Sequence, residues 1–405
     1  MNAISDSAPP STAQRGFDPR VWLLAFGTFA IGTDSFVVSG LLNQLAHDLA
    51  IDLAAAGNVV SSYSLTYGLA APLLAALTGG IRKDRVLQMA LAAFAVSNAL
   101  CAIAPTYPAI IGARILAGLA AALYTPTAYA LAASIATPER KASALGAVAL
   151  GITVSFVAGV PLGIVVGNQF GWHGSFWLVC LLSLIAFAAI SQWPPRGLPR
   201  AMSNRRLAER LAPLFHPRTL LALLPTLFFT AGIISTYTYL GAMLRAHPFP
   251  EETVVFFFFI FGMGGLFGTQ LGGRLIDRFG PVPLLVLFLL VGILDTALYR
   301  ASLAVPATLG GTTFLLHFTL WLLIIGQQRR LIWLSSDHTD VNLALNNSCI
   351  YVGVSVGSSI GGSIIASGFA LDQVPFGSCA LFVAALLIFF ASLYVERRRI
   401  ETANA

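Results

Sequence analysis

Residues 151–167, GITVSFVAGVPLGIVVG, decide how this chain is organised. Small residues recur there at every fourth position: Gly151, Ser155, Gly159, Gly163 and Gly167. On a helix these positions form one continuous face with almost no side chain, which lets a second helix approach closely. Pro161 lies in the same apolar run, where it removes a backbone hydrogen bond and bends the helix, as packed membrane helices tolerate. The stretch therefore predicts a moving joint within a membrane.

Two sets of residues recur after nearly the same interval, 194 positions for the first set and 193 for the second. They are Gly159, Gly163 and Gly167 with Gly353, Gly357 and Gly361, and Gly80, Asp84 and Arg85 with Gly273, Asp277 and Arg278. Such self-similarity at one interval is the signature of a repeat. We therefore expect an internally duplicated chain.

The composition is that of an integral membrane protein. Of the 405 residues, 57% are hydrophobic and 10% are charged, against about a quarter charged in soluble domains, and the mean hydropathy is +0.81. All four cysteines lie in apolar runs, which argues against a disulfide framework. The apolar run after Arg20 is too long for a signal peptide, so we expect no cleaved leader.

Apolar runs long enough to cross a bilayer, about 20 residues each, divide the chain into two halves. We predict twelve spans at about 21–43, 57–79, 86–104, 108–133, 143–167, 174–193, 219–243, 253–273, 281–299, 304–326, 341–368 and 375–395. The predicted domains are a cytoplasmic tail (1–20), a six-helix bundle (21–193), a cytoplasmic linker (194–218), a second six-helix bundle (219–395) and a C-terminal tail (396–405). The fold class is all-α.

The basic residues predict the orientation, because they concentrate in cytoplasmic loops. With both termini inside, 20 of the 23 Lys and Arg fall in inner segments. Arg245 and Arg300 fall outside, and Arg114 lies within the membrane. Since the net charge of +6 resides in loops, it does not indicate a nucleic-acid partner.

Four segments resemble the major facilitator superfamily, and within it the twelve-span drug:proton antiporters, a type that includes sugar and metabolite exporters. They are GTDSFVVSGLL at 32–42, ARILAGLAAALYTP at 113–126, the stretch 151–167 with GWHGSFW at 171–177, and GGRLIDRFG at 272–280. The resemblance implies two bundles around a central cavity, and the glycine and proline stretch resembles the antiporter motif that indicates export.

The resemblance also implies a cytoplasmic latch at two repeated positions: Asp84 with Arg85, and Asp277 with Arg278. The first copy departs from the family pattern, since Arg85 is followed by Val86 and Leu87, and the family's second glycine and trailing basic pair are missing. Arg82 and Lys83 are candidates to take over the basic role in a shortened loop. Ser355 stands 194 positions after Pro161, so the second half lacks the proline.

Asp34 and Arg114 are the leading candidates for proton coupling, because a charge inside a bilayer is costly and marks function. At 1.5 Å per residue, Asp34 lies roughly 21 Å above the inner surface and Arg114 at a similar level. The resemblance places both spans at the central cavity, so we expect the two charges to meet. The alternatives are a permanent structural ion pair, or an Asp34 that faces outside water.

Weaker candidates follow from the same reasoning. Histidine is the side chain that titrates near neutral pH, so His317 is a weaker proton-coupling candidate, with hydrogen-bonded packing as the alternative. Asp295 is expected to snorkel and to pair with Arg300 at the outer surface. Polar aromatic and amide side chains suit a cavity that is part apolar and part hydrogen-bonding: Tyr63, Tyr67, Tyr124, Tyr237, Tyr239, Asn346 and Tyr351. The FFFFIF run at 256–261 is expected to be lipid-facing or core.

The predicted function is export of a small molecule, such as a drug-like compound or a metabolite, by proton antiport with alternating access. The runner-up is proton-linked uptake of a sugar or an organic anion, and the different class is a non-transporting receptor. No catalytic or metal-binding motif is visible, so we expect neither an enzyme nor a cofactor, only the proton gradient. We expect a monomer in a bacterial-type inner membrane, with the lipid bilayer, protons and the substrate as partners.

Overall fold

A computed structural model describes residues 18–195, 217–334 and 339–404, and within this part the chain forms helices and no strands. The helices of the first half are α1 (Val21–Val37), η1 (Val38–Gly40), α2 (Leu42–Asp48), α3 (Leu53–Leu77), α4 (Lys83–Ala102), α5 (Tyr107–Ile135), η2 (Pro138–Arg140), α6 (Lys141–Val154), η3 (Ser155–Gly159) and α7 (Val160–Gln192). Those of the second half are α9 (Pro217–Arg245), α10 (Glu251–Phe279), α11 (Pro281–Ser302), α12 (Pro306–Leu334), α13 (Thr339–Ala366), η5 (Leu371–Gln373) and α14 (Val374–Asn404). The predicted linker and N-terminal tail lie mostly outside the described residues.

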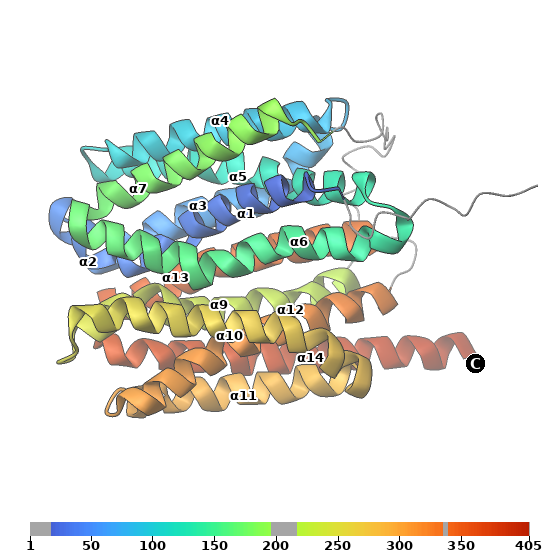
Figure 1. Cartoon of the computed structure of the whole chain (residues 1–405). Coiled ribbons are helices and arrows are strands. Elements are labelled where there is room, and N and C mark those ends of the chain that lie inside the picture. Colours follow the sequence, from blue (N-terminus) through green and yellow to red (C-terminus); the bar gives the residue numbers. More distant parts are fainter. Residues whose placement is uncertain (1–17, 196–216, 335–338, 405) are drawn as a thin grey trace, which may run out of the picture.

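Short polar and glycine signals set where the helices begin and end. Asp52 caps α3, because its carboxylate accepts a hydrogen bond from the Ala55 amide at 2.6 Å. Gly280 ends α10 with a φ of 81°, a backbone region that favours glycine, and Pro281 then starts α11. These signals keep the connections short, so consecutive helices run antiparallel (Figure 1).

Twelve crossings result once a turn at Gly171 is counted. Eleven described helical segments are long and apolar enough to span a membrane, and the longest, Pro138–Gln192, has 55 residues and contains predicted spans five and six. Gly171 leaves the helical region inside α7, with a φ of 73°. Figure 1 shows the green α6 and α7 segment reversing direction at the left of the view. Across this hairpin the Ser175 hydroxyl donates to the Gly163 carbonyl at 2.7 Å.

The helix irregularity predicted at Pro161 is present as a π-turn. Residues Ser155–Gly159 form η3 between α6 and α7, immediately before the proline. Proline has no N–H to donate to the preceding turn, and a π-turn is a common way for a helix to absorb such a defect. The π-turn therefore departs from regular helix geometry within the stretch that the sequence predicts to be a moving joint.

Both glycine faces pack on a helix of their own half. A Cβ added at Gly151, Gly159 or Gly163 would lie under 3.0 Å from atoms of α1, and one added at Gly353 or Gly357 would lie under 3.0 Å from atoms of α9. Close approach is therefore possible only with glycine. Because α1 and α9 open the two halves, the same packing recurs after the same interval, as the duplication predicts.

The two halves of the chain also separate in space. Figure 1 shows α1 to α7, blue to green, in the upper part of the view and α9 to α12 and α14, yellow-green to red, in the lower part, with α13 between them. The hydrophobic core follows the helix faces that meet: within the FFFFIF run, Phe257, Phe258 and Phe261 are buried, whereas Phe256 and Phe259 are 57% and 40% exposed. The run is thus partly core and partly outer surface, at helical spacing.

Candidate functional site

Asp34 and Arg114 form a fully buried ion pair inside the first half. The Nη1 atom of Arg114 on α5 donates to both carboxylate oxygens of Asp34 on α1, each at 2.8 Å, and both side chains are 0% exposed. Arg114 Nε donates to the Val59 carbonyl at 3.2 Å, which ties the pair to α3. The predicted contact between the two charges is therefore present.

Aromatic rings complete the surroundings of this pair. The Arg114 guanidinium lies 4.3 Å from the Tyr63 ring centroid and 5.8 Å from that of Phe176, distances at which a cation is attracted to the ring face. The Ser35 hydroxyl, next to Asp34, donates to Tyr63 Oη at 2.9 Å. Chemically, the site can hold one carboxylate beside one cation, and a proton that neutralised Asp34 would release Arg114 from it.

The predicted cavity residues are buried, and four of the tyrosines touch the other half of the chain. Tyr67 on α3 stacks on Tyr351 of α13, with ring centroids 3.5 Å apart and planes 19° apart. Tyr237 on α9 donates to the Phe36 carbonyl of α1 at 3.2 Å. Tyr239 donates to Ser358 of its own half and lies against Gly57 of α3.

The remaining cavity candidates bond within their own half. Tyr124 donates to the Leu24 carbonyl at 3.1 Å, and Asn346 accepts from the Thr226 hydroxyl at 2.6 Å. Both side chains are 0% exposed. These two therefore support helix packing as observed, whereas the tyrosines at the meeting of the halves lie where alternating access would act.

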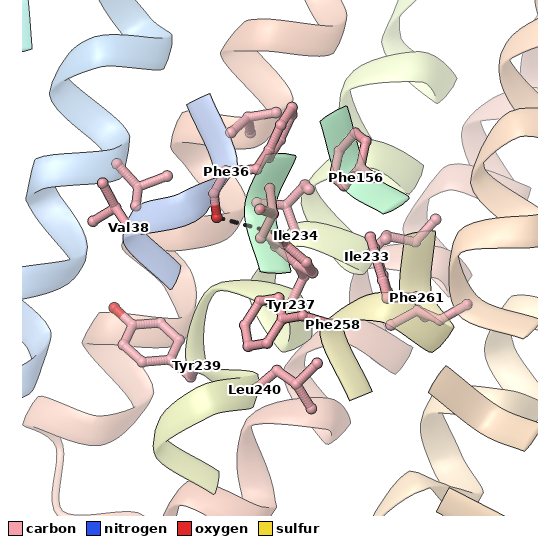
Figure 2. Packing of buried hydrophobic residues seen from close by; sticks show 14 of the residues in the cluster. Phe36, Val38, Phe156, Ile233, Ile234, Tyr237, Tyr239, Leu240, Phe258 and Phe261 are labelled. Atoms are coloured by element: carbon pink, nitrogen blue, oxygen red, sulfur yellow. Dashed lines mark hydrogen bonds between the residues drawn. The ribbon is translucent and has the colours of Figure 1, made fainter. Parts of the chain in front are cut away.

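Sequence reasoning missed an aromatic cluster at the centre of the molecule. The ring of Tyr237 lies 4.4 Å from Phe261, 5.3 Å from Phe258, 6.0 Å from Phe36 and 6.1 Å from Phe156, centroid to centroid. Figure 2 shows these rings converging from η3, α1, α9 and α10, with the Tyr237 hydrogen bond dashed. The FFFFIF run indicates that aromatic side chains gather on this helix. It does not indicate which of them point toward the centre of the molecule.

His317 lies against the same cluster with both ring nitrogens bonded. Its Nδ1 donates to the Phe261 carbonyl at 2.7 Å, and its Nε2 accepts from the Trp321 indole at 3.1 Å. The ring stacks on Phe261 at 4.0 Å and is 0% exposed. An extra proton on Nε2 would displace the Trp321 donor, so the geometry favours the packing alternative for His317.

The expectation for Asp295 is wrong in two respects. Its side chain does not snorkel, because the residue is 4% exposed and turns into the second half. Arg300 pairs instead with Asp372 of η5, at 2.9 Å. Neither carboxylate oxygen of Asp295 has a hydrogen-bond partner among the described residues. The place of Asp295 on the predicted ninth span does not determine whether its side chain points toward lipid or into the helix bundle.

The two predicted latch aspartates each accept hydrogen bonds from an arginine. Asp84 accepts from Arg82 Nη2 at 2.6 Å within its own loop. Asp277 on α10 accepts from Arg329 of α12 at 2.8 Å. Arg85 and Arg278 are exposed, and Arg278 lies 5.2 Å from the Phe279 ring. Arg82 thus supplies the basic partner in the shortened first loop.

A second feature that the sequence did not reveal joins the halves at one end, here called the outer end, which holds the loops 49–52 and 246–250. Arg245 on α9 bonds Glu251 of α10 at 2.6 Å and donates to the Gly40 carbonyl of η1 at 3.0 Å. Asn168 on α7 donates to Glu251 at 3.3 Å and accepts from Gln44 of α2 at 2.9 Å. Four polar side chains therefore link the first half to the second.

A serine ladder closes the same end on the opposite side. Ser61 of α3 bonds the Ser355 carbonyl and the Ser359 hydroxyl of α13, at 3.2 and 3.0 Å, and Ser358 donates to the Gly57 carbonyl at 2.9 Å. Together with the tyrosine stack, these contacts lie in the outer and central parts of the helices. The hydrogen bonds between the halves that are given above, all within the described residues, therefore lie near the outer end and the centre of the molecule. None of them lies at the inner end, which is opposite the outer end.

A duplicated bundle of twelve membrane helices, with a buried charge pair and polar contacts between its halves, defines the class of secondary membrane transporters. Comparison with known families agrees: residues 24–328 match the model of the Major Facilitator Superfamily. The chain belongs to this superfamily, and the predicted all-α major facilitator fold is confirmed.

Relatives and solved structures give further points of reference. The chain is 31% identical to the "Uncharacterized MFS-type transporter YbcL" of Bacillus subtilis (strain 168), over 91% of this chain and 95% of that protein. It is 31% identical to a "Chloramphenicol resistance protein" of Streptomyces lividans, over 64% and 67%. The crystal structure of a D-xylose–proton symporter matches with a TM-score of 0.76 at 15% identity, covering 91% of this chain and 96% of that one. The last likeness bears on the fold alone.

Proposed function

We propose that this transporter exports a small molecule in exchange for protons. The observation that carries the proposal is the Asp34 and Arg114 pair, 0% exposed and bonded at 2.8 Å. A charge at such a site is retained against a large desolvation cost, and ionisable residues in membrane spans commonly serve proton transfer. The glycine face beside Pro161 supplies the joint that the exchange requires.

In the proposed cycle, a proton competes with Arg114 for Asp34. Protonation removes the charge that holds the Nη1 bonds, so Arg114 loses its partner and α5 is free to shift relative to α1. Loss of the proton restores the pair. The pair lies next to Tyr63, whose neighbour Tyr67 stacks on Tyr351 of the other half. A change at Asp34 thus has a short packed route to the contact between the halves.

The hydrogen bonds of Arg245, Glu251, Asn168 and Gln44, here called the outer network, and the serine ladder support a conformation that is closed at the outer end. With the orientation predicted from the basic residues, the end held together by Arg245, Asn168 and Ser61 is the extracellular one. We infer that the structure represents a state closed to the outside. Export then requires these contacts to open, while the glycine faces let α1 and α9 pivot on their partners.

The substrate class that fits best is an amphipathic neutral or cationic compound. The surfaces where the halves meet are aromatic, with hydroxyl groups from Tyr67, Tyr237 and Tyr351 and few charges. The relative described as a chloramphenicol resistance protein favours export of drug-like molecules. Proton-linked uptake of a sugar is the second candidate, and the π-turn with Pro161 in the antiporter-like stretch argues against it.

Everted membrane vesicles test the direction of transport. Acidifying the vesicle lumen should drive accumulation of a test compound and raise the luminal pH, reported by a pH-sensitive dye, because protons leave as substrate enters. Vesicles with the Asp34→Asn variant at equal protein content serve as the control. If the compound instead accumulated when the vesicle lumen was alkaline, substrate and protons would move in the same direction. The proposal of proton-coupled export would then be replaced by proton-linked uptake. We also expect an inner-membrane protein with both termini cytoplasmic, so protease added to the everted vesicles should reach the termini. Cross-linking should give a monomer.

A further inference from the structure

A groove between α7 and α10 at the outer end lies apart from the buried charge pair. Its volume is about 610 Å³, within the range of pockets that hold drug-sized ligands. The first half contributes Pro161, Val165, Asn168 and Gln169, and the second half contributes Glu251, Glu252, Val255, Phe256 and Phe259. Residues of both halves are therefore needed to form it.

The chemistry of the lining is divided between two ends. Val165, Phe256 and Phe259 give an apolar and aromatic wall, with Phe256 57% and Phe259 40% exposed. Glu251 and Glu252, in the first turn of α10, place two carboxylates at the other end. A ligand that fits must therefore combine an apolar body with a polar or charged group.

Charge counting fixes the sign of that group. Arg245 bonds Glu251 at 2.6 Å and so offsets one of the two negative charges. Glu252 has no hydrogen bond or ion pair within the described part of the chain, which leaves a net charge of −1 at the groove. Among ligands with an apolar body, one positive charge is the complement. Aromatic rings add to this preference, since a cation near a ring face is attracted to it.

We propose that this groove binds an amphipathic organic monocation, with its charge at Glu252 and its apolar body against Phe256, Phe259 and Val165. Anionic phospholipids fit less well, because their phosphate would meet the carboxylates that attract a cation, and a bound zwitterionic lipid is distinguished by the mass spectrometry described below. The site is distinct from the Asp34 region, and its occupation does not depend on the direction of transport.

Binding across both halves has a conformational consequence. A ligand that contacts Val165 on α7 and Phe259 on α10 binds well only while these helices lie together, so it favours the state closed at the outer end. The cation would therefore act as an inhibitor of opening as well as a ligand. Its effect on transport should not be overcome by raising the concentration of a substrate that binds elsewhere.

Equilibrium dialysis of radiolabelled tetraphenylphosphonium with the purified full chain in detergent tests the site. We expect Glu252→Gln and Phe259→Ala each to raise the Kd about tenfold or more, with unchanged thermal unfolding. The matched control Glu139→Gln removes an exposed carboxylate elsewhere and should leave the Kd unchanged. Tetramethylammonium, which has the charge without the apolar body, should compete only weakly.

Two binding results, and a third from mass spectrometry, would overturn the proposal. One is an unchanged tetraphenylphosphonium Kd in a folded Glu252→Gln variant, since charge recognition would then lie elsewhere. The other is loss of binding in Tyr351→Ala with full binding in Phe259→Ala, which would place the cation at the centre of the molecule. Native mass spectrometry that finds a phospholipid retained by the wild type, lost in Phe259→Ala and not displaced by tetraphenylphosphonium, would likewise assign the groove to lipid.

Discussion

The ion pair between Asp34 and Arg114 allows a structural role to be separated from proton coupling. Asp34→Asn leaves the Arg114 guanidinium buried with a charge and no carboxylate, while the Val59 carbonyl at 3.2 Å remains its acceptor. Removing one partner of a buried pair costs about 3–5 kcal/mol. Arg114→Gln leaves the opposite charge unpaired and should cost a similar amount. The double variant carries no charge at this site, and its two amides can bond each other.

We therefore expect the free energy of unfolding of the double variant to exceed that of either single variant by about 2 kcal/mol or more, because both desolvation penalties are removed. Proton-driven transport should not return with stability, since neither amide releases a proton. A purely structural pair predicts the opposite, recovery of both properties together. The two readouts thus distinguish the hypotheses.

The assay combines thermal unfolding in detergent with transport by proteoliposomes under an imposed pH gradient. A matched control is Asp372→Asn, which breaks the partly exposed pair with Arg300. That change should cost less than about 1 kcal/mol and leave transport intact. Wild-type proton coupling in Asp34→Asn, or full transport by the stabilised double variant, would refute Asp34 as the proton carrier.

Three further predictions concern packing and opening. Gly151→Ala should destabilise the protein by about 1–3 kcal/mol, since its Cβ would lie under 3.0 Å from an α1 carbonyl oxygen. Gly146→Ala on the same helix meets nothing within 4 Å and should stabilise by about 0.5–1 kcal/mol; equal melting curves would contradict the close packing. Arg245→Gln should destabilise the state closed at the outer end by about 1 kcal/mol, which should speed alkylation of a cysteine introduced at the buried Ser39 at least fivefold. An unchanged alkylation rate would show that these hydrogen bonds do not hold the outer end closed. Tyr351→Ala should weaken substrate binding about two- to tenfold through the lost ring stack, and an unchanged Kd would remove this tyrosine from the cavity.

The sequence by itself determined the membrane fold and its duplication. Runs of about 20 apolar residues can satisfy their backbone in lipid only as helices, so the number of crossings followed from composition. The glycine faces at Gly159 and Gly357 were readable because close packing leaves no room for a side chain, whatever the neighbour is. The level of Asp34 and Arg114 followed from the constant rise of a helix, and their contact agrees with it.

Only the tertiary structure decided how each helix is rotated and which side chains meet. In a membrane, lipid and protein core are both apolar, so periodicity does not separate inward from outward faces as it does in water. Asp295 was therefore placed on the wrong face, and the inner and outer phenylalanines of 256–261 were not distinguished in advance. The outer network joins Asn168 to Glu251, 83 positions apart, and Arg245 to Gly40, 205 positions apart, and such contacts arise only when the two halves are brought together. Rotation and long-range pairing depend on the combined packing of all helices, which no local stretch encodes.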